Sequence, residues 1–211
     1  MQGSNMLRGA LATLGVASLL ALSACGGSDG TTTEPSASTS SSSAVPSSNP
    51  PEPKKATPEG PAQNLVPPEL PEEAKEFSEE GFKAFIEYWF EAQNYGLATG
   101  DGSYVEKISH EDCPFCRTTL RMTKNIADNG GEMWIVGGQS EATGITVKIH
   151  GGQDQMQVAY LTLRQTAGDA YDDEGLIDGG ENILEDAVDP FEFAAYYQDG
   201  AWTAARIEVQ Q

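Results

Sequence analysis

Apolar side chains recur at helical spacing near the middle of the chain. Five of them fall at positions i, i+3, i+4, i+7 and i+8 and form one broad face: Phe82, Phe85, Ile86, Trp89 and Phe90. Ser78 is a suitable N-cap, and Glu79 and Glu80 suit the positive end of the helix dipole. The pattern predicts a helix that begins after Ser78 and ends at Tyr95-Gly96.

Two further helices are predicted before residue 131. A short one covers residues 101–109, with Tyr104, Val105 and Ile108 turned inward. The other begins between Asp112 and Pro114, because proline is favoured in a first helical turn, and it runs to about residue 128. The run Asn129-Gly130-Gly131 is a strong stop signal.

After residue 131 the apolar period changes from helical to two, which is typical of strands. Strands are predicted over residues 133–136, 145–150, 155–166, 191–197 and 202–209, and Asp199-Gly200 between the last two is a strong hairpin signal. Three N-terminal helices followed by an antiparallel sheet of four or more strands predict an α+β fold.

The first 25 residues have the pattern of an export signal. Arg8 precedes an apolar run over residues 11–22, which is too short to span a bilayer. Leu22-Ser23-Ala24-Cys25 is similar to a bacterial lipobox. We therefore expect residues 1–24 to be a lipoprotein signal peptide and Cys25 to carry a diacylglyceryl group. The alternative is a plain secretory signal followed by an incidental cysteine.

Residues 25–67 are predicted to be a tether. Gly, Ser, Thr and Pro make up 26 of the 42 residues from 26 to 67, and this stretch holds no aromatic residue. Such a composition buries too little apolar surface to offset the entropy of ordering the chain. The folded part is therefore expected to be one domain over residues 68–211.

The charge of the chain narrows its partners. Its 211 residues hold 12 Lys and Arg against 32 Asp and Glu, a formal net charge of −20, and 28 of the acidic residues lie in residues 68–211. This balance argues against sequence-independent nucleic-acid binding and against a basic patch on anionic lipid. A membrane link would instead come from the lipid on Cys25.

Cys113 and Cys116 are the sharpest chemical feature. Three residues apart at a helix start, they lie within bonding reach outside the cytoplasm. A structural disulfide is favoured. A thiol-disulfide oxidoreductase is the first alternative, because a helix N-terminus lowers a thiol pKa. A metal site that adds His110 is the second, and it lacks a further Cys/His pair. No metal or cofactor is predicted.

Residues 167–189 are predicted to be a long acidic loop, with nine acidic residues and no basic one. The spacing does not fit a calcium-binding EF-hand. A solvated insertion is favoured over weak calcium binding or contact with a basic partner, with Leu176, Ile177, Ile183 and Leu184 docked on the sheet.

Several local stretches resemble a known family. Residues 82–102, residues 109–116 with their Cys-Pro-Phe-Cys run, and Asp199-Gly200-Ala201-Trp202 resemble an uncharacterised family of actinobacterial lipoproteins. The element order is also similar to the nuclear-transport-factor-2-like cone, in which helices close a curved sheet around a pocket. That resemblance implies a cone-like α+β domain, a fold that serves both enzymes and binding modules.

A pocket inside such a cone would be lined by aromatic side chains. The candidates are Phe85, Trp89, Tyr95, Trp134, Tyr160, Tyr197 and Trp202. The sequence favours a non-enzymatic module, lipid-anchored on the extracytoplasmic face of the cell membrane. It would bind a small apolar ligand or an envelope protein. The alternative is an extracytoplasmic enzyme, either the oxidoreductase or a cone-pocket isomerase or hydrolase.

Overall fold

The structure is a computed structural model that describes residues 51–177 and 184–210. The predicted signal peptide, Cys25, most of the predicted tether and Ile183 lie outside these residues. The helices are η1 (Glu73–Lys75), α1 (Glu79–Thr99), α2 (Ser103–Lys107) and α3 (Pro114–Asp128). The strands are β1 (Met133–Gly137), β2 (Ser140–Lys148), β3 (Gln157–Gln165), β4 (Gly168–Asp172), β5 (Gly175–Leu176), β6 (Ala187–Gln198) and β7 (Ala201–Val209).

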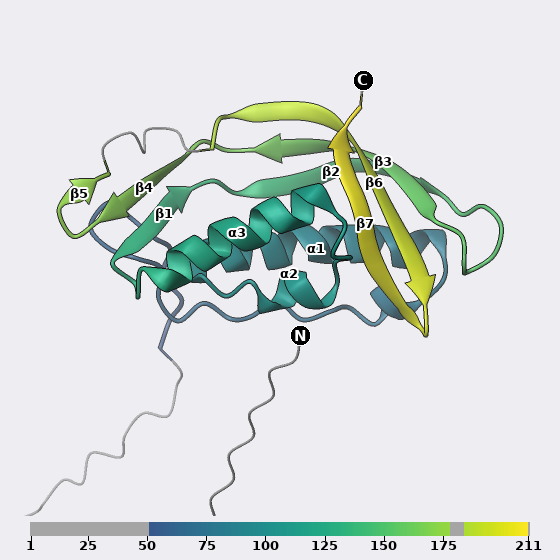
Figure 1. Cartoon of the computed structure of the whole chain (residues 1–211), viewed down its shortest axis with the longest axis horizontal. Helices are drawn as coiled ribbons and strands as arrows, with labels where there is room; N and C mark the ends of the chain where they lie inside the picture. Colours follow the sequence, from purple (N-terminus) through teal and green to yellow (C-terminus); the bar gives the residue numbers. More distant parts are fainter. Residues whose placement is uncertain (1–50, 178–183, 211) are drawn as a thin grey trace, which may run out of the picture. The chain divides into compact units, whose positions relative to one another are not determined.

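The α+β class is confirmed, but the described strands form two sheets rather than one. One antiparallel sheet has the order β1-β4-β5, and the other has the order β2-β3-β6-β7. Neither sheet closes into a barrel. The helices lie along one side of the curved strands, with α1 and α3 beneath them (Figure 1).

The main core lies between α1 and the four-stranded sheet. Phe82 stacks on Trp202 with ring centroids 4.5 Å apart, and Phe85 meets Phe193 edge to face at 6.1 Å. The aromatic polar atoms in this core have partners, since the Trp202 indole N–H donates to the Glu76 carbonyl and the Tyr197 hydroxyl to the Lys75 carbonyl. The apolar face of α1 is therefore consumed by packing.

Helix α1 extends one turn beyond the predicted end. Its Ser78 hydroxyl accepts from the Gly81 N–H as the cap predicts, but its C-cap is Gly100, at φ +79°. Gly96 lies inside the helix where α3 crosses, and a Cβ there would come 2.9 Å from Cγ2 of Thr123. Gly96 thus serves close helix packing, and the left-handed Gly100 ends the helix.

The segment predicted as a long acidic loop is partly strand. β4 pairs with β1 over residues 168–172, and β5 pairs with β4. The inward positions of β4 are Gly168 and Ala170, which carry too little apolar surface to give a strand signal in the sequence. Of the residues predicted to dock on the sheet, Leu184 packs against the small core of Leu97, Ile126 and Ile135, whereas Leu176 is exposed.

The ordered chain begins before the predicted boundary at residue 68. Lys54 pairs with Gln63, and Thr57 pairs with Gly60, which makes a short hairpin of residues 54–63, the N-terminal hairpin. The indole N–H of Trp134 in β1 donates to the Thr57 carbonyl at 2.8 Å. Part of the predicted tether therefore belongs to the folded domain.

Candidate functional site

The seven aromatic residues predicted to line one pocket lie in separate places. Four are in the main core, packed against other side chains: Phe85, Trp89, Tyr197 and Trp202. Tyr160 is 47% exposed on the opposite face of β3. Trp134 stacks on Tyr171 between β1 and β4. Only Tyr95 and Trp134 line hollows, and these hollows lie beneath the N-terminal hairpin.

The larger apolar site is a cavity between the N-terminal hairpin, α1 and β1, which we call the hairpin cavity. Its volume is about 350 Å³. Leu65 after the hairpin, Leu97 on α1 and Ile135 on β1 give it three apolar walls. A second hollow of about 560 Å³ lies on the other side of the hairpin, and the two share Ala62 and Ala98. The hairpin thus forms a wall of both spaces.

A few polar side chains border the hairpin cavity. The Asn94 amide bonds both the N–H and the carbonyl of Ser140 at 2.8 Å, so its position is fixed. Tyr95 meets Tyr104 edge to face at 5.3 Å, and partial burial is the first cause of a raised pKa of the Tyr95 hydroxyl. Its hydroxyl therefore stays protonated at neutral pH. Apolar walls with a few placed polar groups are typical of small-molecule sites.

Cys113 and Cys116 lie within disulfide-bond distance, with Cα atoms 5.3 Å apart. Cys113 is the N-cap of α3, and its Sγ accepts from the Cys116 N–H. Both residues are buried in the main core, at 0% and 1% exposure. An external thiol must reach a sulfur atom before exchange can occur, so this burial favours the structural disulfide over the oxidoreductase.

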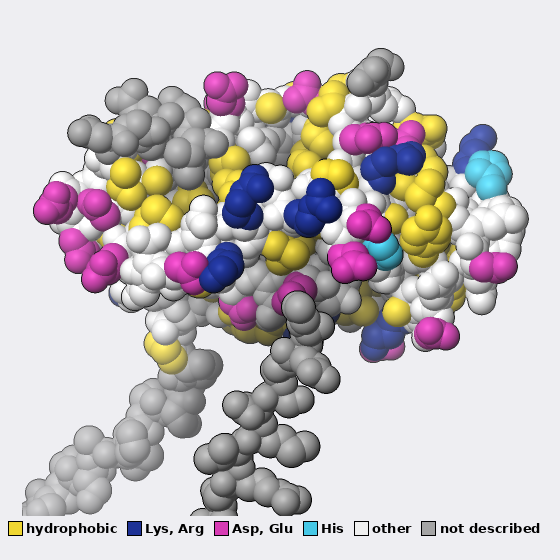
Figure 2. Space-filling model, viewed as in Figure 1, with side chains coloured by type: hydrophobic (Ala, Val, Ile, Leu, Met, Phe, Trp, Pro, Cys, Tyr) yellow, Lys and Arg dark blue, Asp and Glu magenta, His cyan; other side chains and the backbone are white. Residues whose placement is uncertain are grey.

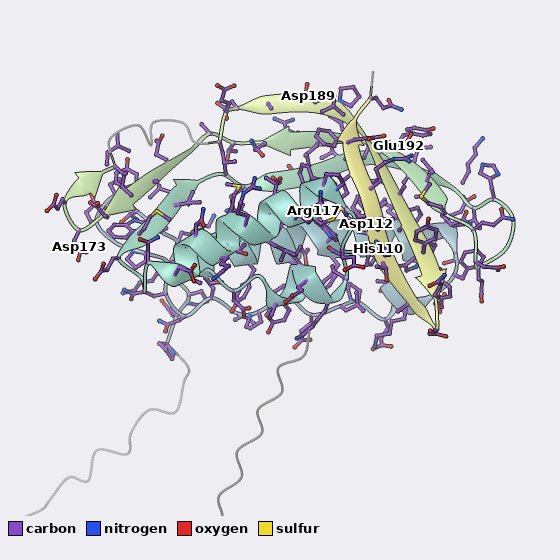
Figure 3. The ribbon with its side chains drawn as sticks, viewed as in Figure 1. His110, Asp112, Arg117, Asp173, Asp189 and Glu192 are labelled. Carbon is purple, nitrogen blue, oxygen red and sulfur yellow. A yellow bond between two sulfur atoms is a disulfide. The ribbon has the colours of Figure 1, made fainter. Side chains whose placement is uncertain are left out.

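His110 lies beside the disulfide on the exposed loop before α3. Its Nδ1 accepts from the Asp112 N–H at 3.2 Å, and its backbone N–H donates to the Ala204 carbonyl of β7 (Figure 3). Within the described ranges, no three His, Cys, Asp or Glu residues group closely enough to hold a metal ion. The cysteines, bonded to each other, cannot serve as thiolate ligands.

The acidic residues of the β4–β5 hairpin gather at one end of the molecule. Figure 2 shows them at that end, and Figure 3 places Asp173 at its tip, away from His110 and Asp112. Asp172, Asp173 and Glu174 border a shallow hollow of about 280 Å³ with Asn129 and Glu132. This is a solvated, strongly negative surface.

Comparison with family models gives one assignment for the chain. Residues 51–208 match the model of a family of unknown function, DUF6318. The chain belongs to this family. The match begins within three residues of the N-terminal hairpin, so the family domain includes the hairpin and both hollows beside it. A comparison with curated proteins finds no significant match. None of the helices in residues 51–177 and 184–210 is long and apolar enough to cross a membrane.

Proposed function

We propose that this protein is a lipoprotein held on the extracytoplasmic face of the cell membrane by a lipid on Cys25, and that its domain binds a small apolar ligand. The observation that carries the binding role is the hairpin cavity. Its volume of about 350 Å³ falls in the range of ligand pockets, and its walls are mainly apolar. The lipobox-like Leu22-Ser23-Ala24-Cys25 supports the anchor.

The anchor and the cavity act together in this proposal. Residues 26–50 form a tether of about 25–30 Å as a random coil, and they lead directly into the hairpin that walls the cavity. The domain then works close to the membrane, where apolar molecules concentrate. The curved sheet beside α1 supports a distant relationship to the nuclear-transport-factor-2-like cone, with the binding space outside the filled interior.

Ligand binding is tested on residues 25–211 carrying Cys25→Ser. The probe is N-phenyl-1-naphthylamine, an uncharged dye whose fluorescence rises in apolar surroundings. We expect saturable binding that Ala98→Phe weakens at least tenfold, because Ala98 lines the hairpin cavity and a phenyl ring there occupies it. Ala201→Phe is the matched control, since Ala201 is exposed at the start of β7. Equal dye binding by the two variants contradicts the assigned cavity.

The anchor is tested separately in cells. Wild-type chain and the Cys25→Ala variant are compared by membrane fractionation and by intact mass after detergent extraction. We expect a diacylglyceryl mass increment on the wild type and none on the variant, which leaves the membrane fraction. A variant that stays as firmly membrane-bound as the wild type refutes the lipid anchor without affecting the cavity.

A further inference from the structure

The four-stranded sheet has two edges, and they differ in how their backbone groups are used. On β7, the Ala204 N–H donates to the Ile108 carbonyl and the Ala204 carbonyl accepts from the His110 N–H. On β2, the Asn94 side chain bonds both backbone groups of Ser140. The loop before α3 thus covers part of one edge, and Asn94 caps only the first residue of the other.

The remainder of the β2 edge is open. Ser140 directs its N–H and carbonyl away from β3, so the period of two gives Ala142 the same direction. The register shifts at the bulge between Thr143 and Thr146, after which Val147 faces the edge. In the part of the chain that the structure describes, no hydrogen bond reaches the edge-facing groups of Ala142 or Val147. Unpaired edge groups are a template for another strand.

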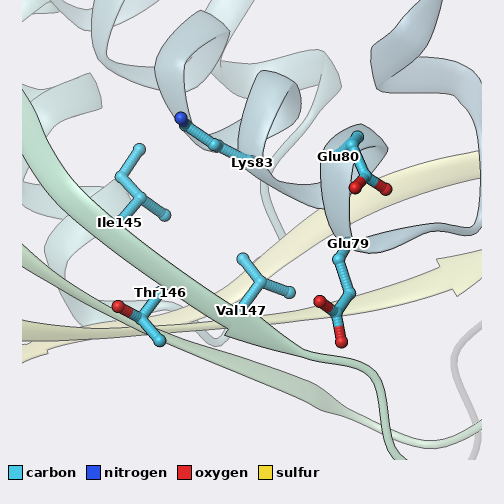
Figure 4. A pocket seen from close by; sticks show the side chains of 6 residues that line it. All are labelled: Glu79, Glu80, Lys83, Ile145, Thr146 and Val147. Atoms are coloured by element: carbon cyan, nitrogen blue, oxygen red, sulfur yellow. The ribbon is translucent and has the colours of Figure 1, made fainter.

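A groove of about 380 Å³ runs beside this edge, between β2 and the first turns of α1. Ile145 and Val147 point toward α1, whereas Thr146 points to the other side of the strand (Figure 4). Glu79 and Glu80 stand across the groove on α1. The groove also contains Lys83, whose Nζ lies 3.9 Å from the carboxylate of Glu87. It therefore combines an apolar floor, free main-chain groups and two carboxylates.

We propose that the β2 edge binds an extended basic segment of a partner protein by strand addition. The segment pairs its main chain with the edge at Val147 and alternates its side chains across the sheet. A Lys or Arg on the inner side lays its aliphatic stem over Ile145 and Val147 and directs its charge to Glu79 and Glu80. The alternation gives specificity for a basic residue at every second position.

Charge decides among the possible occupants. A second copy paired edge to edge would bring two chains of net charge −20 together and oppose Glu79 and Glu80 of one copy to the same strongly acidic surface of the other. Residues 1–50 of this chain offer only one basic residue, Arg8, inside the expected signal peptide. A basic segment of another protein is the occupant that the groove complements.

The binding test uses residues 25–211 with Cys25→Ser and a fluorescent seven-residue peptide of alternating Lys and Thr, with Lys at both ends. The reference peptide has Glu in place of Lys. Fluorescence polarisation at 150 mM salt is expected to show the Lys peptide binding at least tenfold more tightly. Equal binding of the two peptides overturns the proposal.

Strand pairing is tested by N-methylating each peptide amide in turn, on unaltered groove residues. We expect at least tenfold losses at every second amide, because only those amides face β2, and changes below twofold at the amides between them. A flat profile across the peptide means adsorption to an acidic surface and overturns strand addition.

The groove is tested by Glu79→Gln with Glu80→Gln, expected to weaken Lys-peptide binding about five- to tenfold. The matched control is Glu106→Gln with Glu111→Gln, which removes the same charge from exposed positions outside the groove and is expected to change affinity less than twofold. Equal losses in both variants contradict the groove. A dimer in sedimentation velocity that Val147→Arg abolishes assigns the edge to a second copy and also overturns the proposal.

Discussion

Asn94 fastens α1 to the first residue of β2, and the cost of removing it follows from its contacts. Nδ2 donates to the Ser140 carbonyl and Oδ1 accepts from the Ser140 N–H, both at 2.8 Å. A protein hydrogen bond contributes about 0.5–1.5 kcal/mol, and a buried group left without a partner costs about 1–3 kcal/mol. Ser140 is only 4% exposed, so water reaches it poorly. We expect Asn94→Ala to lower the free energy of unfolding by about 2–4 kcal/mol.

The assay is urea unfolding of residues 25–211 with Cys25→Ser, followed by tryptophan fluorescence, with a thermal melt alongside. A loss of that size lowers Tm by about 4–16 °C in a domain of this length. Asn125→Ala is the matched control, because Asn125 is exposed on α3 and alanine is the better helix former. Its unfolding free energy should stay equal or rise by a few tenths of a kcal/mol.

Two outcomes would refute the reasoning. One is a loss below about 0.5 kcal/mol for Asn94→Ala, which would mean that water replaces both hydrogen bonds. The other is an equal loss for Asn125→Ala, which would mean that the effect belongs to asparagine removal in general.

Three further predictions concern the disulfide, the N-terminal hairpin and a buried tyrosine. Cys113→Ser with Cys116→Ser should lower the free energy of unfolding by about 2 kcal/mol or less, since the closed loop is short, and in the unaltered chain alkylation with intact mass should show reduction by dithiothreitol only as the domain unfolds. Reduction in native buffer would contradict the structural role. Trp134→Phe removes the N–H that bonds Thr57 but keeps the ring, so trypsin should cut at the hairpin lysines about fivefold faster with little change in Tm; an unchanged cutting rate would mean that this bond does not hold the hairpin. Burial raises the pKa of Tyr88, so the unfolded chain ionises first, and the stability present below pH 10 is lost as pH rises toward the folded pKa. Urea unfolding at pH 9 and pH 11 should show a smaller loss in Tyr88→Phe than in the wild type, and equal losses would contradict the shift.

The sequence was sufficient where one local signal determined the structure. Ser78 begins α1 because its hydroxyl can accept from Gly81, whatever lies around it. Asp199 and Gly200 turn β6 into β7 with φ +53° and +81°, the conformations that the Asp-Gly pair favours. Cys113 and Cys116 come within bonding distance because three residues at a helix start place them there. These features depend on neighbours along the chain.

Tertiary structure decided what the apolar and small residues do. The aromatic period of α1 predicted a buried face, but only the packing against Phe193 and Trp202 shows that this face fills the core and leaves no pocket there. Gly168 and Ala170 carried no strand signal, and β4 exists because β1 lies beside them.

The N-terminal hairpin is the clearest case of structure that the sequence did not reveal. Its proline-rich composition predicted a tether, yet a single indole N–H from Trp134, far along the chain, holds it against the domain. The hairpin cavity and the β2 groove arise in the same way, from residues that only the fold brings together. Local conformation is encoded by adjacent residues, whereas cavities and open strand edges depend on contacts between distant ones.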